Sequence, residues 1–153
     1  MAKGFKITYK GDLKDLERCA ADASQIMEAA LLEGANVAAD ALRSQLNALK
    51  TSDEIAPQGG KRYANRTEKQ ALSNNMGYSP QGERGSKIDR KAGFQGYTDK
   101  GFPVPKLANF INKGAGYQMR QPFLDIATTN AKREASSKIE KKINDEITKR
   151  LKT

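Results

Sequence analysis

Apolar residues recur at helical spacing near both ends of the chain and predict two long amphipathic helices. In the first, no proline occurs between about residues 13 and 49, and apolar side chains return every three, four or seven residues. This spacing places them on one side of a long helix, with Asp12 as its N-cap. Gly34 marks either a kink in this helix or a close contact with another helix; the alternative is an ordinary glycine tolerated on a surface helix. The apolar positions are Leu13, Leu16, Ala20, Ala23, Met27, Leu31, Ala38, Leu42, Leu46 and Leu49.

The second helix begins at Pro122, a residue suited to a helix N-terminus, and continues with no further glycine or proline. After Leu124 its apolar residues repeat every fourth position, so the stripe rotates by about 240° between Ala127 and Leu151. One flat surface cannot cover such a stripe. We expect the alanine-rich first half to pack within the domain and the isoleucine-rich second half to face a neighbouring subunit. The residues expected to pack and to form the subunit interface are Phe123, Leu124, Ile139, Ile143, Ile147 and Leu151.

Shorter patterns predict the rest of the fold. Apolar and polar residues alternate over residues 5–9 and again over 88–97, which is typical of half-buried strands, and glycines in the second stretch indicate a bulge or bend. Pro105 and Gly114 are placed to start and to stop a short helix. The predicted fold class is α+β, with long N-terminal and C-terminal helices packed on a small, mainly antiparallel β-sheet.

The middle of the chain, at about residues 51–87, is rich in glycine and proline and has one short apolar island around Leu72 and Met76. An extended polar loop of this length is unusual in a compact domain and tends to serve a function. We expect it to lie against a partner or to fold as a short hairpin. Its partner-facing residues are expected to be Lys61, Arg62 and Arg66.

The composition indicates a chain whose hydrophobic core is incomplete without other subunits. The length of 153 residues favours a single domain over residues 1–153. Leu, Ile, Val and Phe together supply only 27 of these residues, close to the fraction at which chains of high net charge become disordered. Alanine favours helix formation but fills a core poorly. We therefore expect a thin core that association with other subunits completes.

The net charge of +9 is concentrated towards the C-terminus, where residues 101–153 hold an excess of six positive charges. Such a region either lies near a polyanion such as nucleic acid or simply keeps the surface hydrated. Acidic residues are interleaved with the basic ones, so no base-reading face stands out, and non-specific contact with a DNA backbone stays open. The basic residues that would line a DNA path are Lys138, Lys141, Lys142, Lys149 and Arg150.

Catalytic chemistry finds little support in the residue types present. The chain has no histidine, which excludes histidine-based nucleophile systems and disfavours the common zinc sites, and Cys19 is its only cysteine. The segment from Gln58 to Arg62 is similar to a phosphate-binding loop but lacks its first glycine and its final Ser or Thr. We predict no enzyme activity, no cofactor and no metal. No apolar run indicates a signal peptide or a membrane span, so we expect an intracellular protein with no membrane partner.

Three segments of the second half of the chain resemble a family of long-tailed bacteriophage proteins. They are Ala92-Gly93-Phe94-Gln95-Gly96-Tyr97, then PVPKLANFI at residues 103–111, and Gln121-Pro122-Phe123-Leu124-Asp125-Ile126-Ala127. The shared features are a strand ending near glycine and aromatic residues, a short helix with an Ala-x-Phe core, a glycine turn at Gly114, and a Pro-Phe-Leu start to a long terminal helix. The family is that of the tail-component or tail-completion proteins of the phage neck. The N-terminal strand and first helix also fit its opening, and the resemblance is weakest over residues 51–87.

The resemblance implies a structural virion protein that forms an oligomeric ring at the head-proximal end of the tail and helps to join head and tail around the DNA path. It implies a homo-oligomer, for which six copies would match the usual tail symmetry. The implied partners are other neck and tail proteins, such as the tail terminator, tail tube and head-closure proteins. The implied location is the virion, with assembly in the host cytoplasm. The alternative from the residues alone is a small, basic, non-specific DNA-binding protein.

Overall fold

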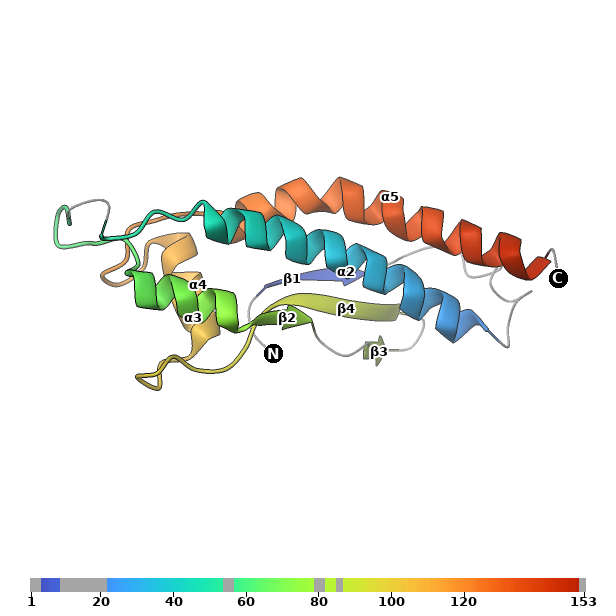
Figure 1. Ribbon diagram of the computed structural model, residues 1–153, viewed down its shortest axis with the longest axis horizontal. Coiled ribbons are helices and arrows are strands. Elements are labelled where there is room, and N and C mark those ends of the chain that lie inside the picture. The colour runs from blue at the N-terminus through green and yellow to red at the C-terminus, as the bar shows by residue number, and fades with distance from the viewer. Residues whose placement is uncertain (1–3, 9–21, 54–56, 79–81, 85–86, 152–153) are drawn as a thin grey trace.

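The computed structural model describes residues 4–8, 22–53, 57–78, 82–84 and 87–151 (Figure 1). The two long helices run antiparallel side by side over the sheet, and the two short helices lie at one end of the molecule. The fold class is therefore α+β, as the sequence predicts. In chain order the elements are strand β1 (Gly4–Thr8), helix α2 (Ala23–Asn47), helix α3 (Arg66–Asn74), strands β2 (Met76–Tyr78), β3 (Gly82–Arg84) and β4 (Lys87–Phe94), helix α4 (Val104–Lys113) and helix α5 (Phe123–Leu151).

Strand β4 is the centre of the sheet because every other strand pairs with it, always antiparallel. Asp89 of β4, for example, lies opposite Thr8 of β1 on one side and Gly82 of β3 on the other. Residues pair one to one along each register, so the bulge expected in this strand is absent from the described pairs. The strand ends before Gly96, whose φ of 78° turns the chain away from the sheet.

Helices α2 and α5, which lie side by side, each carry a row of buried residues spaced by four. Such residues form a ridge along a helix surface, and the ridges of two helices can interdigitate. The row on α2 is Ile26, Ala30, Gly34, Ala38, Leu42 and Leu46. The row on α5 is Phe123, Ala127, Ala131, Ala135, Ile139 and Ile143. Small residues occupy the middle of both rows, and Gly34 is buried in the row on α2. Val37 and Ala41 of α2 pack with Ala131 and Ala135 of α5. The predicted start of the first helix, at residues 12–21, lies outside the described residues.

The isoleucine-rich half of α5 packs on its own chain, so the expectation that it faces a neighbouring subunit is wrong. Ile139 and Ile143 are buried in a cluster that α2 and Ala92 of β4 complete, and Ile147 packs against that cluster. Phe123 belongs to a second cluster, built by α3, α4 and the C-terminal half of α2. The apolar stripe rotates around α5 as predicted, but different elements of the same chain cover its successive parts. Helices α3, α4 and α2 surround Phe123, whereas α2 and β4 cover Ile139 and Ile143.

Residues 66–74, expected to belong to an extended polar loop, form helix α3 instead. The Asn65 side chain accepts a hydrogen bond from the Glu68 backbone N–H at 2.8 Å, and the Glu68 carboxylate accepts one from the Asn65 N–H at 2.9 Å. This reciprocal pair is a capping box, which satisfies two free donors at the start of the helix. Leu72 is the buried residue that anchors α3 to the core. The same predicted loop also contains strands β2 and β3.

The junction between α4 and α5 forms as predicted and is fixed by two residues. Gly114 ends α4 with φ of 69°, and a Cβ added there would lie 2.7 Å from the Cβ of Arg120. The buried side chain of Asn112 accepts hydrogen bonds from the backbone N–H groups of Leu124 at 2.9 Å and Asp125 at 3.3 Å. Asn112 therefore caps the first turn of α5 from the preceding helix.

Candidate functional site

Glu68 is the centre of a polar network at the α3–α4 end of the molecule, which comprises residues 57–75 and 95–122. Two nitrogens of the Arg62 guanidinium donate to its carboxylate at 2.9 and 3.0 Å. The Gln118 side-chain amide donates at 3.3 Å and the Tyr117 hydroxyl at 3.4 Å. The Arg62 guanidinium also lies 4.8 Å from the centre of the Tyr117 ring. The network therefore fastens the turn after α4 to the start of α3.

The network keeps Glu68 ionised although its side chain is only 15% exposed. Burial alone would raise the pKa of Glu68, but the hydrogen bonds from Arg62 and from the Asn65 N–H outweigh it and hold the pKa below its ordinary value. The bond to Glu68 in turn raises the pKa of Arg62. Backbone bonds join the same segments, since the Arg62 N–H donates to the Tyr117 carbonyl at 2.9 Å and the Met119 N–H donates to the Arg62 carbonyl at 2.8 Å.

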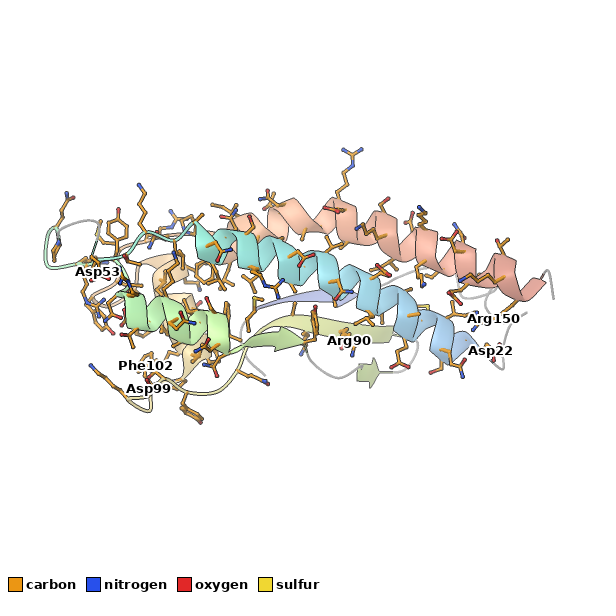
Figure 2. The ribbon with its side chains drawn as sticks, in the orientation of Figure 1. Asp22, Asp53, Arg90, Asp99, Phe102 and Arg150 are labelled. Carbon is orange, nitrogen blue, oxygen red and sulfur yellow. The ribbon has the colours of Figure 1, made fainter. Side chains whose placement is uncertain are left out.

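A cleft opens beside α3 next to this network. It consists of two adjoining hollows of about 460 and 350 Å³, which share Thr67, Ala71, Thr98 and Asp99. Phe102 and Leu107 give the larger hollow an apolar part, while the smaller one is lined mainly by polar side chains of α3. Figure 2 shows Asp99 and Phe102 at this end of the molecule. We call the two hollows together the α3 cleft.

The rim of the α3 cleft carries exposed aromatic and cationic side chains. Tyr97 is 69% exposed and Tyr117 is 47% exposed, which makes them the two most exposed large hydrophobic residues in the described part of the chain. The Arg66 side chain is 87% exposed and reaches only Asp53, at 3.8 Å. Lys100 is exposed and makes no ion pair with another described residue. Tyrosine and arginine are enriched at protein–protein interfaces, so this rim has the composition of a docking surface.

The α3–α4 end also contains most of the net positive charge of the chain. Its two segments hold eight Lys and Arg residues against two acidic ones, Glu68 and Asp99. Helix α5 holds seven basic residues against five acidic ones. The folded chain therefore presents its excess charge at the α3–α4 end, whereas the rise in charge along the sequence had pointed to the terminal helix.

The five basic residues of α5 that we expected along a DNA path are largely neutralised by neighbouring acids. Lys142, Lys149 and Arg150 all reach Glu146, and their contacts, with Arg150 contributing most, lower the pKa of Glu146 to about 2. Arg150 also pairs with Asp22 at 2.9 Å, which ties the end of α5 to the start of α2 (Figure 2). The remaining two differ, since Lys138 pairs with Glu134 at 3.6 Å while Lys141 has no ion pair with a described residue.

The three basic residues expected to face a partner have different roles in the structure. Arg62 pairs with Glu68 in the polar network and also lines the larger hollow of the α3 cleft, so its role towards a partner stays a prediction. Lys61 donates to the Gly114 carbonyl at 2.6 Å and so helps to hold the turn after α4. Arg66, the first residue of α3, has a side chain that is 87% exposed and pairs with Asp53 at 3.8 Å.

Most of the residues expected at a subunit interface lie in the core. Phe123 is buried and packs edge-on against Phe94, with ring centres 6.1 Å apart. Leu124 is partly buried against the same cluster. Ile139, Ile143 and Ile147 pack on α2 as described above. The side chain of Leu151 lies outside the described part of the structure.

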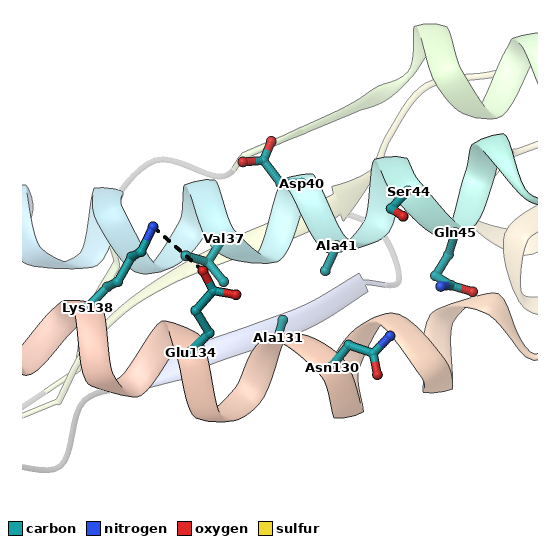
Figure 3. A pocket seen from close by; sticks show the side chains of 9 residues that line it. All are labelled: Val37, Asp40, Ala41, Ser44, Gln45, Asn130, Ala131, Glu134 and Lys138. Atoms are coloured by element: carbon teal, nitrogen blue, oxygen red, sulfur yellow. Dashed lines mark ion pairs between the residues drawn. The ribbon is translucent and has the colours of Figure 1, made fainter.

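A second, shallower groove runs along the seam between α2 and α5 (Figure 3). It has a volume of about 270 Å³, and Val37, Ala41 and Ala131 form its small apolar floor. Asp40, Glu134 and Lys138 stand at its sides, where the ion pair between Glu134 and Lys138 is exposed. Compared with the α3 cleft, this groove has no exposed aromatic residue in its lining.

Two kinds of feature are absent from the described ranges. Within them, no group of three or more His, Cys, Asp or Glu side chains is positioned to hold a metal ion. In the same part of the chain, no helix combines the length and the apolar character that crossing a bilayer requires.

Sequence reasoning named Arg62 and Arg66, which line the α3 cleft, but missed the other residues that build it. The spacing Asn65-x-x-Glu68 is a capping-box pattern and could have revealed the start of α3. No comparable local signal joins Glu68 to Tyr117 and Gln118, because they lie about fifty residues further along the chain. Comparisons with protein-family models, with curated proteins and with solved structures find no match for this chain.

Proposed function

We propose that this protein is a non-enzymatic structural subunit of a bacteriophage neck, which forms an oligomeric ring at the head-proximal end of the tail. The proposal starts from the resemblance of residues 92–127 to the tail-completion proteins. It locates the protein in the virion, after assembly in the host cytoplasm, with itself and other neck and tail proteins as partners.

The observation that carries the proposal is the order of elements over the resembling segments. Strand β4 ends beside Gly96 and Tyr97, helix α4 contains Ala108 and Phe110, and the turn at Gly114 leads to Phe123 at the start of α5. This is the arrangement that the resemblance leads us to expect. The exposed tyrosines of the α3 cleft add support, because a subunit of an assembly needs surfaces of this composition.

The direct test is the mass of the purified full chain, measured by size-exclusion chromatography with light scattering over a concentration series. We expect a discrete species at a fixed multiple of the 16.8 kDa subunit, with ring-shaped particles in negative-stain electron micrographs. Association into a closed ring gives one defined mass, whereas open chains give a mass that grows with concentration. A monomer at every concentration would count against the proposal.

The alternative is a small, non-specific DNA-binding protein, and the basic α3–α4 end favours it. Eight Lys and Arg residues gathered at one end suit contact with a phosphate backbone. A mobility-shift assay with duplex DNA at 50–200 mM salt separates the two functions. Tight binding by a monomer, falling by about 10³-fold or more over this range, would favour the alternative. Weak binding by an oligomeric species would favour the neck protein.

A further inference from the structure

The rim of the α3 cleft presents exposed groups suited to binding. Arg66 lines the smaller hollow with the exposed ring of Tyr97, and its ion pair with Asp53 is long, at 3.8 Å. Lys100 lines the larger hollow, and Asp99 lines both. Next to them the apolar part of the cleft, at Phe102 and Leu107, could receive an aliphatic side chain. An apolar pocket with an aromatic and cationic rim is the arrangement that binding hot spots favour.

The outer face of α2 has the complementary features. Leu32 is 39% exposed, and Glu28 and Asn36 lie one turn before and after it on the same side of the helix. Glu33 follows Leu32, and neither Glu28 nor Glu33 forms an ion pair with a described residue. Elsewhere on α2, Asp40 pairs with Arg43, the single basic residue of the helix. Glu33 lies about 100° further around the helix than Leu32 and is partly buried, and Asn36 accepts a hydrogen bond from the Tyr78 hydroxyl at 2.7 Å. We call Glu28, Leu32, Glu33 and Asn36 the acidic face of α2.

The two surfaces lie towards opposite ends of the molecule. The N-terminal half of α2 lies at the end where Asp22 meets Arg150, and the α3 cleft lies at the end marked by Asp99 and Phe102 (Figures 1 and 2). A contact between two different surfaces of identical subunits is heterologous, and it generates a ring when the rotation between subunits closes. One copy can thus bind a neighbour through each surface at the same time.

We propose that the acidic face of α2 from one copy of this chain docks on the α3 cleft of the next copy. Glu28 and Glu33 then face Arg66 and Lys100, and Leu32 enters the cleft. This inference deepens the proposed function and rests on it, because it names the contact from which the ring would be built. A nucleic acid would use the same cations, but it would have no need of the acidic face of α2.

Charge reversal on each side provides the test. In the full chain, Glu28→Lys with Glu33→Lys makes the α2 face basic, so that it repels the basic rim of the α3 cleft. Arg66→Glu with Lys100→Glu makes the rim acidic, so that it repels the acidic face of α2. We expect each double variant to assemble at least tenfold more weakly than the native chain in light scattering. An equimolar mixture of the two variants should recover assembly, because every basic α2 face then meets an acidic cleft. Added salt should weaken the native assembly.

Matched controls separate this contact from a general effect of charge. Glu134→Lys with Glu140→Lys, and Lys132→Glu with Lys141→Glu, make the same changes in net charge on the exposed surface of α5. We expect both to assemble as the native chain does. Far-UV circular dichroism and the midpoint of urea unfolding establish that each variant is folded, and recovery in the mixture also requires folded subunits.

The possible results of these experiments distinguish a failure of the docking contact from a failure of the proposed function. Rings that form normally in both double variants would overturn the inference and leave the proposed function standing. Charge-dependent assembly into open chains would support the inference and contradict the ring. A native chain that stays monomeric would overturn both. If Arg66→Glu with Lys100→Glu abolished binding to duplex DNA and the mixture did not recover assembly, the cations would serve nucleic acid and the inference would be wrong.

Discussion

The α2–α5 pair and the α3–α4 end are stabilised by different kinds of interaction. Between α2 and α5, apolar side chains of both helices are buried in shared clusters, and the charged residues stay on the surface. At the α3–α4 end, a partly buried carboxylate with its hydrogen-bond donors joins segments that are far apart in sequence. Apolar packing has no strong dependence on pH, whereas the polar network depends on the charge of Glu68.

This difference separates the part of the molecule that holds the fold together from the part that is exposed for binding. Ion pairs on α5 cancel most of its charge locally, so the helix pair presents a nearly neutral surface. The α3–α4 end turns Arg62 and Glu68 inward and leaves Arg66, Tyr97 and Lys100 exposed. We therefore expect substitutions in the helix pair to change stability, and substitutions on the rim of the α3 cleft to change association.

The largest effect is expected for Phe123→Asp, at the point where the two regions meet. This substitution places a carboxylate in the buried cluster beside Phe94 and should cost more than ~4 kcal/mol, enough to unfold or disassemble the protein. Circular dichroism and sedimentation of the soluble fraction measure the loss. Phe123→Leu, which stays apolar, should cost only about 1 kcal/mol. A soluble and fully assembled aspartate variant would contradict the prediction.

Ile139→Ala should destabilise the helix pair by about 2–4 kcal/mol because it leaves a cavity against α2. The loss should be the same at pH 5 and pH 8, since no ionisable group in the cluster changes its charge. Urea unfolding at both pH values measures it. Ile126→Ala on the exposed side of the same helix serves as the control, and it should change stability by less than about 0.5 kcal/mol. Equal losses for the two variants would refute the assignment of Ile139 to the core.

Glu68→Gln should destabilise the protein by about 2 kcal/mol at pH 7, because it removes the charge that Arg62 pairs with in a half-buried site. The folded-state pKa of Glu68 is lowered, so its contribution is fully present above the ordinary pKa of a glutamate and is lost as the pH falls through the folded value. The native chain and the variant should therefore converge in stability under acid. A difference that stays constant from pH 7 to pH 3 would show that charge is not the cause.

Asn112→Ala should cost about 1 kcal/mol, because the first N–H groups of α5 lose their acceptor. The amides of Leu124 and Asp125 should also exchange with deuterium faster, while the amides in the middle of α5 stay protected. Asn112→Asp retains an acceptor and should recover part of the loss. If exchange at the start of α5 were unchanged, the capping role would be wrong.

The smallest effect is expected for Glu134→Gln, which breaks the exposed pair with Lys138 beside the seam groove. Exposed pairs at this spacing are worth only about 0.3–0.5 kcal/mol, and salt screens them. The measured loss should fall within that range at low salt and vanish in high salt. A loss as large as that of Glu68→Gln would remove the contrast between the surface of the helix pair and the α3–α4 end.

The sequence predicts the long helices and the α4–α5 junction because their signals are local. The four-residue spacing on α5, Pro105 and Gly114 each act within one or two turns of their own position. The same spacing led to the wrong prediction that Ile139 and Ile143 face a neighbouring subunit. The elements that cover them, α2 and β4, lie far from α5 in the sequence, so the local pattern does not reveal them. Helix α3 has one buried residue, Leu72, so its apolar pattern is too weak to be detected. The Glu68 network depends on partners that only the fold brings together.

The buried row on α2 has a consequence for synthesis of the chain on the ribosome. A chain is made from its N-terminus, so α2 emerges well before residues 123–151, the segment that covers it. Over that interval Ile26, Ala38 and Leu42 have no α5 to pack against, and the strands that pair with β4 cannot do so until β4 has been made. The folding of this protein is therefore delayed until its last helix has been made, and a chain that stops before α5 should aggregate.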